Sequence, residues 1–300
     1  MQYKKIWKHF PLLLGWGIAS VILLSAVFAW HNQNSESRRT VYETILEKKR
    51  AVDQIRIYLL KSIEMEKSAV MSLTDQESME YAKQSRDASA AVDQNLAALR
   101  TLIHSRPNEQ KLLEEFAACW AELGKVDEDI LQLAVKNTNL KAAALSREQG
   151  GEIMQRFEMA LDEIRPALPE GQAAAMVCRA INAALKIFNL HAPHITETND
   201  KKMDQLEARI KTEEGVVTQS LAALDDIFPT GKPESLIEAK AIFAEFMNLN
   251  SQVLQLSRQN SNIRSLELSM GRKRSIAAMC DEATVALEEA VKQTTFKATK

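Results

Sequence analysis

Two short polar motifs with the same internal spacing are the best candidates for a binding site in this chain of 300 residues. Each motif combines two amide side chains with one basic side chain, and the second follows the first at a shift of 123 positions. The six residues are Asn137, Asn139 and Lys141 in the first motif, and Asn260, Asn262 and Arg264 in the second. Together they could form a polar layer that binds a small ligand through hydrogen bonds.

A structural role is the alternative for Asn137 and Asn260. Both fall on a heptad seam of apolar residues, where a buried asparagine often fixes the register or the oligomeric state of packed helices at some cost in stability. Under this interpretation, replacing Asn137 with leucine should raise the thermal stability.

Two histidines offer a weaker candidate site. His191 and His194 are three residues apart, so a helix would place both on one face as possible metal ligands. Pro193 lies between them, and no nearby cysteine or carboxylate completes a ligand set, so we predict no metal site.

Basic residues on the first long helical stretch could meet an anionic ligand, although such residues usually form a solvated face. They are Arg50, Arg56 and Lys61. The chain contains no GxSxG, HExxH, P-loop or Rossmann glycine motif. We therefore expect neither catalysis nor a cofactor.

The composition favours long helices. With only 9 glycines, 7 prolines and 6% aromatic residues, the chain lacks the turn residues and ring clusters typical of β-sandwiches and barrels. The net charge of -2 gives no basic excess, so no nucleic-acid partner is expected. Three cysteines, Cys119, Cys178 and Cys280, lie far apart without the spacing of a zinc site or a disulfide framework.

Residues 11–30 carry no charge and are long enough to cross a membrane. Lys4, Lys5 and Lys8 precede them, and the positive-inside rule then places residues 1–10 in the cytoplasm. We predict a single-pass protein of the inner membrane, with the bulk of the chain periplasmic or extracellular. A cleaved signal peptide is the alternative, since Val27 and Ala29 could precede a cleavage site.

Heptad spacing and an internal repeat define the rest of the chain. Apolar residues at alternating spacings of three and four run from Leu112 to Ala144, which predicts one continuous helix through Asn137. Residues 113–146 align without a gap on 236–269, and the match includes positions off the seam, such as Gln132 with Gln255. This similarity indicates a duplicated module of about 125 residues, longer than the usual solenoid repeats.

Breaker residues predict four antiparallel helices in each module. The modules are expected at 31–168 and 169–300, with Asp75 as an N-cap, Pro107 near a helix start and a bend at Gly150-Gly151. The predicted helices are 34–73, 76–104, 108–147 and 150–165, followed by 170–198, 200–227, 233–269 and 272–297. The fold class is therefore all-α: an N-terminal transmembrane helix and two four-helix bundles.

This organisation resembles the sensory region of bacterial methyl-accepting chemotaxis proteins. The stretch DILQLAVKNTNLKAAALS, residues 129–146, is similar to the third-helix pattern of that four-helix bundle. The resemblance implies an extracytoplasmic sensory region that responds to a small-molecule or protein stimulus and works as a homodimer. The second membrane span and the cytoplasmic signalling part of that family are not in this chain, which would end before them.

Two alternatives to a chemoreceptor remain open. The bundle could be the input domain of a sensor histidine kinase or a cyclase, since the same kind of module serves those proteins. It could also be a membrane-anchored helical adaptor without a signalling output.

Overall fold

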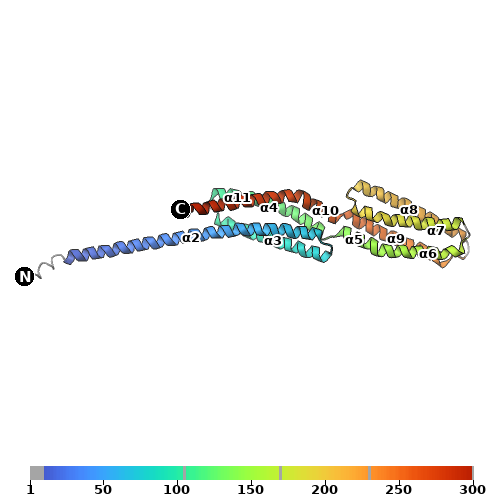
Figure 1. The fold of residues 1–300 in the computed structure, drawn as a ribbon, viewed down its shortest axis with the longest axis horizontal. Coiled ribbons are helices and arrows are strands. Elements are labelled where there is room, and N and C mark those ends of the chain that lie inside the picture. The colour runs from blue at the N-terminus through green and yellow to red at the C-terminus, as the bar shows by residue number, and fades with distance from the viewer. Residues whose placement is uncertain (1–9, 104–105, 169–170, 229–230, 299–300) are drawn as a thin grey trace, which may run out of the picture. The chain divides into compact units, whose positions relative to one another are not determined.

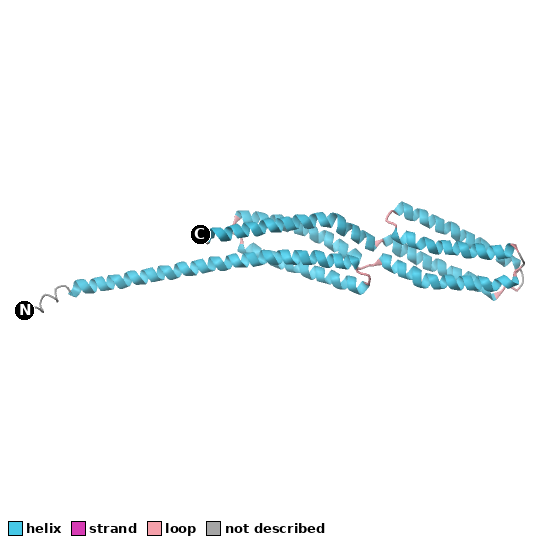
Figure 2. Cartoon of the chain, viewed as in Figure 1, coloured by secondary structure: helices cyan, strands magenta, loops and turns pink. Residues whose placement is uncertain are grey.

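The computed structural model describes residues 10–103, 106–168, 171–228 and 231–298, and its regular elements are all helices (Figure 1; Figure 2). No strand occurs in these four ranges. The all-α prediction is therefore confirmed, in agreement with the scarcity of glycine and proline.

The helices divide into long α-helices, two five-residue π-helical turns (η1 and η3) and one 3₁₀ turn (η2). In chain order they are α2 (Phe10–Met71), α3 (Asp75–Leu102), α4 (Pro107–Ala134), α5 (Thr138–Leu145), η1 (Ser146–Gly150), α6 (Gly151–Ile164), η2 (Arg165–Ala167), α7 (Gln172–Thr196), α8 (Asp200–Ile227), α9 (Glu234–Gln259), α10 (Ser261–Leu268), η3 (Ser269–Lys273) and α11 (Arg274–Ala298).

The chain forms two compact units, each assembled from segments that are distant in the sequence. Unit 1 combines residues 1–60, 88–121 and 278–300, and unit 2 combines residues 61–87 and 122–277. The predicted modules, 31–168 and 169–300, follow the chain order instead. They describe the repeat in the sequence, whereas each compact unit contains residues from both sides of position 168.

Unit 1 is built from parts of α2, α3, α4 and α11. Its buried apolar residues come from all four helices and include Ile55, Val92, Phe116 and Leu287. Polar contacts tie the same helices together: the Trp120 indole N–H donates to Asp93 Oδ1 at 2.7 Å. The fourth helix of this unit, α11, belongs to the second repeat of the sequence.

An apolar core in unit 2 is formed by α6, α7, α8 and α9, with Ala142 of α5. Phe157 of α6 packs against Phe243 of α9, with ring centroids 5.7 Å apart. Helix α6 belongs to the first repeat, whereas α7, α8 and α9 belong to the second. Each repeat therefore contributes its last helix to a bundle that it forms with three helices of the other repeat.

The duplication is visible in the helix bounds. At a shift of 125 residues, α3 coincides with α8, and α2 and α7 end at equivalent residues, Met71 and Thr196. At a shift of 123 residues, α5 coincides with α10 and η1 coincides with η3. The predicted repeat thus corresponds to a repeated series of helices, short α-helical segments and π-helical turns.

Two predicted local signals were wrong in detail. Asp75 is the first residue of α3, and the oxygen that accepts from the Glu77 N–H is that of Thr74, one residue earlier. Gly150 and Gly151 do not bend the chain, because both have right-handed helical backbone angles and η1 continues directly into α6. Pro107 begins α4 as predicted, where its missing N–H costs nothing.

Among the described residues, no helix has the length and apolarity needed to cross a bilayer. The basic residues Lys4, Lys5 and Lys8 lie outside the described residues, as do most side chains of the predicted membrane segment 11–30.

Candidate functional site

The two polar motifs lie at chain breaks within unit 2. Asn137 separates α4 from α5, and Asn260 separates α9 from α10. Both have left-handed backbone angles, with φ of 49° and 51°, and they are the described non-glycine residues with positive φ. The predicted continuous helix through Asn137 was therefore wrong: asparagine tolerates this conformation better than most residues and lets the chain turn there.

The two motifs cap each other's helices. The first amides of α5 have no side-chain cap from Asn137, and the Thr138 N–H donates to Ser261 Oγ at 3.0 Å. In return, the Ser261 N–H donates to Thr138 Oγ1 at 3.1 Å. Asn139 and Asn262 repeat this exchange one residue later, each backbone N–H donating to the other's Oδ1 at 3.2 Å. The first backbone N–H groups of a helix have no partner within the helix. Here the side chains of each motif accept hydrogen bonds from the first N–H groups of the other motif's helix.

The side-chain amides form a second reciprocal set. Asn139 donates from Nδ2 to Asn260 Oδ1 at 2.7 Å, and Asn262 donates from Nδ2 to Asn137 Oδ1 at 2.9 Å. The remaining amide donors of the two turn residues reach Asp75 Oδ1 and the Glu197 carbonyl oxygen. Asn137, Asn139 and Asn260 are buried. We call these four asparagines, with Thr138 and Ser261, the asparagine clamp.

The two basic residues of the motifs are arranged differently. Lys141 forms an ion pair with Asp75 at 2.8 Å, and hydrogen bonds from Lys141 and Asn137 lower the pKa of that carboxyl group. Arg264 is exposed. The structure thus brings the four asparagines and Lys141 into one network. Because protein atoms already take up the amide donors, these contacts favour the structural interpretation, and ligand binding by the six residues stays a prediction.

The two histidines are buried and bonded to protein groups. His191 lies between Ser146 Oγ, 2.8 Å from Nδ1, and Asn250 Oδ1, 3.0 Å from Nε2. His194 lies between Ser257 Oγ and Glu207 Oε1 in the same way. Burial lowers the pKa of both imidazoles, although the hydrogen bond to Asn250 opposes this at His191 and Glu207 opposes it at His194.

A buried ionic cluster in unit 2 was missed by the sequence reasoning. Lys273 of η3 donates to Glu66 Oε2 of α2 at 2.6 Å and also to Asp127 Oδ1 of α4. Ser85 of α3 donates to the Ser62 carbonyl oxygen and lies 3.4 Å from Asp127 Oδ2. Burial raises the pKa of Glu66 and of Asp127, while Lys273 opposes the shift at both. The repeat offered a signal for this cluster: Glu66 aligns with His191 and Asp127 aligns with Asn250, so both carboxylates replace neutral polar residues of the other repeat.

The basic residues of α2 are partly engaged in ion pairs. The Arg56 guanidinium lies 3.3 Å from Asp281 and 3.6 Å from Glu288, both on α11. Asp281 and Glu288 therefore pair with the Arg56 guanidinium, which we considered as a binding group for an anionic ligand. Arg50 and Lys61 are exposed.

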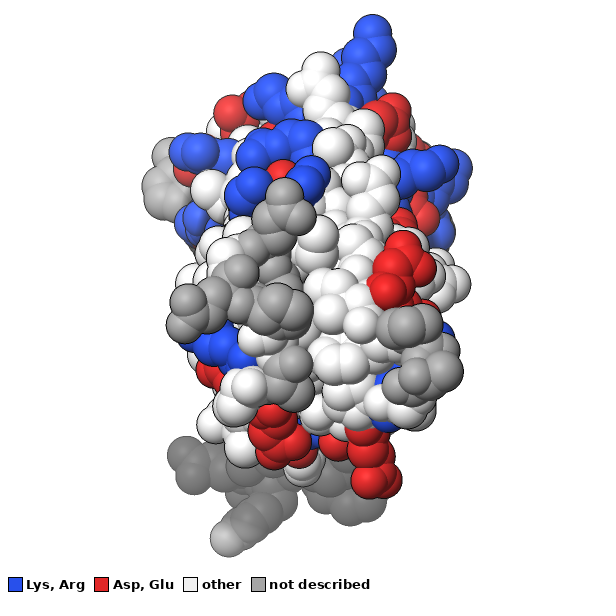
Figure 3. All heavy atoms as spheres, turned by 90° about the vertical axis from the view of Figure 1, so that its right-hand side faces the viewer, with Lys and Arg blue, Asp and Glu red and all other residues white. Residues whose placement is uncertain are grey.

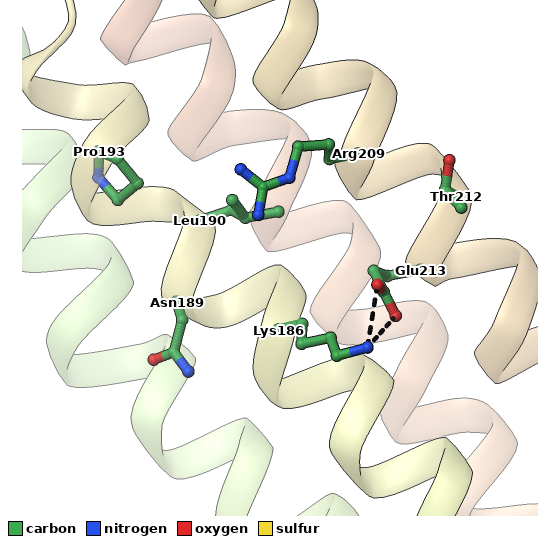
Figure 4. A pocket seen from close by; sticks show the side chains of 7 residues that line it. All are labelled: Lys186, Asn189, Leu190, Pro193, Arg209, Thr212 and Glu213. Atoms are coloured by element: carbon green, nitrogen blue, oxygen red, sulfur yellow. Dashed lines mark hydrogen bonds and ion pairs between the residues drawn. The ribbon is translucent and has the colours of Figure 1, made fainter.

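A groove lies between α7 and α8 (Figure 4). It comprises two adjoining hollows of about 400 and 530 Å³ that share Lys186 and Glu213. Lys186 donates to both oxygens of Glu213, at 3.2 and 3.3 Å. Figure 4 shows the Arg209 side chain reaching from α8 towards Leu190 of α7.

The groove carries a positive charge excess. Arg179, Lys186 and Arg209 line it together with one carboxylate, Glu213. Among the described residues, Arg179 and Arg209 have no ion-pair partner. Asn189 and Pro193 also line the groove, and Pro193 lacks the N–H that would normally bond the Asn189 carbonyl oxygen four residues earlier. A site of this composition suits a small anion that also carries a hydrogen-bond donor.

Comparison with known proteins supports the fold and the general function. Residues 10–166 match the sequence model of a family described as a four helix bundle sensory module for signal transduction. The matched segment spans α2 to α6 and includes Asn137, Asn139 and Lys141. A search among curated proteins finds no match to this chain.

Proposed function

Because this chain belongs to the family of four-helix-bundle sensory modules for signal transduction, we propose that it is the extracytoplasmic input region of a bacterial chemoreceptor. The family match over residues 10–166 is the observation that carries this proposal. Membership gives the general function, an input module for signal transduction. The proposal adds the connection to chemotaxis, the membrane anchor and the side of the membrane on which the bundles lie.

The sequence supports an anchor at residues 11–30, with the N-terminus in the cytoplasm and the remaining chain in the periplasm. Leu24, Phe28 and Trp30 are exposed on α2, and burial in lipid would remove this apolar surface from water. Two copies would pair in the membrane, as the resemblance to chemotaxis receptors implies.

The stimulus that we propose is a small anion bound in the α7–α8 groove. Arg209 would bind a carboxylate or a similar group through its planar guanidinium, which suits oxyanions. Lys186 and Glu213 would set the length of the ligand, because their ion pair lies where the two hollows meet. Electrostatic attraction would favour anions over cations here, since the groove has three basic residues and one acidic residue.

A surface with a large field of one sign would instead indicate a polyanionic partner such as nucleic acid. On the face shown in Figure 3, basic and acidic side chains are interspersed around a band of uncharged residues. This face therefore does not present the continuous basic patch that is typical of nucleic-acid binding.

One natural cysteine can test both the location and the ligand. Cys178 is exposed and lines the groove, whereas Cys280 is buried. In intact cells whose outer membrane has been permeabilised, a membrane-impermeant maleimide should label Cys178 of the full chain without lysis. Adding acetate, succinate or citrate should slow this labelling if one of these anions binds beside the thiol.

Cys178→Ser is the control for the labelled position, and Arg209→Ala is the control for the ligand. Labelling that requires cell lysis would contradict the periplasmic location and favour a different cellular role. Labelling that none of the anions slows, or that slows equally in Arg209→Ala, would contradict the anion site while leaving the location supported.

A further inference from the structure

The repeat places two polar layers at equivalent positions in unit 2. At the shifts that superimpose the helices, Glu66 corresponds to His191, Asp127 to Asn250, Ser269 to Ser146 and Lys273 to Gly150. In each layer the first residue lies near the end of a helix, and the last residue closes a π-helical turn. π-Helical turns inside longer helices frequently occur at functional sites.

The two layers differ in charge. The layer around His191 is neutral: its imidazole lies between a hydroxyl and an amide oxygen, and Gly150 brings no side chain. The Cβ of any other residue at position 150 would lie 3.1 Å from the Phe188 ring, which leaves little room for a lysine. The layer around Glu66 has two carboxylates and one ammonium group, all buried. We call it the ionic layer.

The ionic layer carries one negative charge too many when both carboxylates are ionised. Lys273 can balance only one of them, and Glu66 Oε1 is buried without any hydrogen-bond partner among the described residues. An unpaired carboxylate oxygen in a protein interior is costly, whereas the same oxygen in a neutral carboxyl group costs much less. One added proton would make the layer neutral.

The groups around the ionic layer do not supply the missing positive charge. Helix α3 contributes the Ser85 hydroxyl, and η3 contributes the Ser269 hydroxyl, which lowers the pKa of Glu66 by less than burial raises it and forms no hydrogen bond to Oε1. Glu128, which follows Asp127 in the sequence, is paired with Arg86 at 3.0 Å, and Arg272, which precedes Lys273, is paired with Glu122 at 3.2 Å. The charge imbalance is therefore retained within the layer.

We propose that the ionic layer is a proton-binding site and that pH is a stimulus of this module. One proton enters the layer on Glu66 or Asp127 as the pH falls, and the neutral layer packs α2, α4 and η3 more stably than the charged layer does. The layer around His191 has no charge to balance and does not respond in this way. Proton binding is a property of the chain alone, and only its use as a signal rests on the sensory function proposed above.

The sign of the pH effect follows from the direction of the shift. Because burial raises the pKa of both carboxyl groups, the folded chain holds a proton that the unfolded chain releases. The free energy of unfolding is then greatest at a pH below the ordinary pKa of a carboxyl group, and it falls as the pH rises through the raised pKa of the folded state. For one proton, the unfolding equilibrium constant changes by up to about tenfold per pH unit.

The test compares full-length chains in detergent between pH 5 and pH 8. The wild type should show the infrared band of a protonated carboxyl group, and its unfolding constant should rise with pH. Glu66→Gln replaces the charge with a neutral amide, so the band should disappear and the pH dependence should decrease. Asp127→Asn, measured in parallel, should have the same effect and serves as the second variant if Glu66→Gln does not fold.

Glu128→Gln is the matched control, because Glu128 is adjacent to Asp127 but its pKa is lowered by hydrogen bonding to Arg86. This variant should retain both the infrared band and the pH dependence of the wild type. A wild type without the band, or variants at Glu66 and Asp127 that unfold with the wild-type pH dependence, would overturn the proposal. Neither result would bear on Cys178 labelling, so failure of this proposal is distinguishable from failure of the proposed function.

Discussion

Asn137 and Asn260 hold the backbone in a conformation that few residue types tolerate. A left-handed residue with a branched or bulky side chain costs roughly 1–2 kcal/mol, and Asn137 also bonds Asp75 and Asn262 through its amide. Each such hydrogen bond contributes about 1 kcal/mol. The expectation that leucine at this position would raise stability was therefore based on the wrong backbone geometry.

We now expect Asn137→Leu to lower the free energy of unfolding by about 2–4 kcal/mol, as measured by chemical denaturation. Asn137→Gly separates the two contributions: glycine accepts the positive φ but makes no side-chain bonds, so its loss should be smaller by about 1–2 kcal/mol. Asn260→Leu should resemble Asn137→Leu, because its φ and contacts are equivalent. Increased stability in Asn137→Leu would show that the clamp does not hold the chain breaks.

At the scale of helices, the sequence predicted the main elements but placed one break incorrectly. The apolar spacing of the sequence continues through both asparagines, so the heptad pattern contains no sign of the interruption. The buried face nevertheless changes after the break: α5 buries Thr138, Asn139 and Ala142 rather than the seam residues Leu140 and Ala144. The predicted bend at Gly150-Gly151 failed for the opposite reason. Glycine is permitted in a bend but does not require one, and here both residues remain helical.

These two glycines allow a prediction with an internal control. Gly151 has open space around a built Cβ, so Gly151→Ala should raise the free energy of unfolding by about 0.5–1 kcal/mol through helix propensity alone. Gly150→Ala should gain less, because its Cβ would lie 3.1 Å from Phe188 Cε2 and the ring must move. An equal increase in the free energy of unfolding for both variants, measured by thermal and chemical unfolding, would show that the Phe188 ring can move without loss of stability.

At the scale of the whole molecule, the candidate sites required the fold as well as the repeat. Sequence reasoning found the duplication and the six motif residues, but it treated each repeat as one module. Nothing in the apolar pattern distinguishes a fourth helix that packs on its own repeat from one that packs on the other, because α6 and α11 present similar faces. For the same reason, Glu66 and Lys273, 207 positions apart, could not be paired from the sequence.

The exchange of last helices predicts which fragment of the chain folds alone. Residues 138–259 contain α5 to α9 and hold the apolar cluster that these helices form, including Phe157 and Phe246. The second sequence module, 169–300, lacks α6 and would expose the surface that Phe157, Leu161 and Ile164 cover. Burying each such side chain contributes about 1.5–3 kcal/mol, a large share of the stability of a small domain.

We therefore expect residues 138–259 to unfold cooperatively in denaturant and to protect backbone amides from hydrogen exchange. Residues 169–300 should show a broad transition and weak protection, even though both fragments are of similar length. Adding a peptide of residues 138–168 to the second fragment should restore cooperative unfolding, because it supplies the missing helix. The opposite ranking would mean that α11 can close the bundle in place of α6, and that the exchange of last helices is not needed for stability.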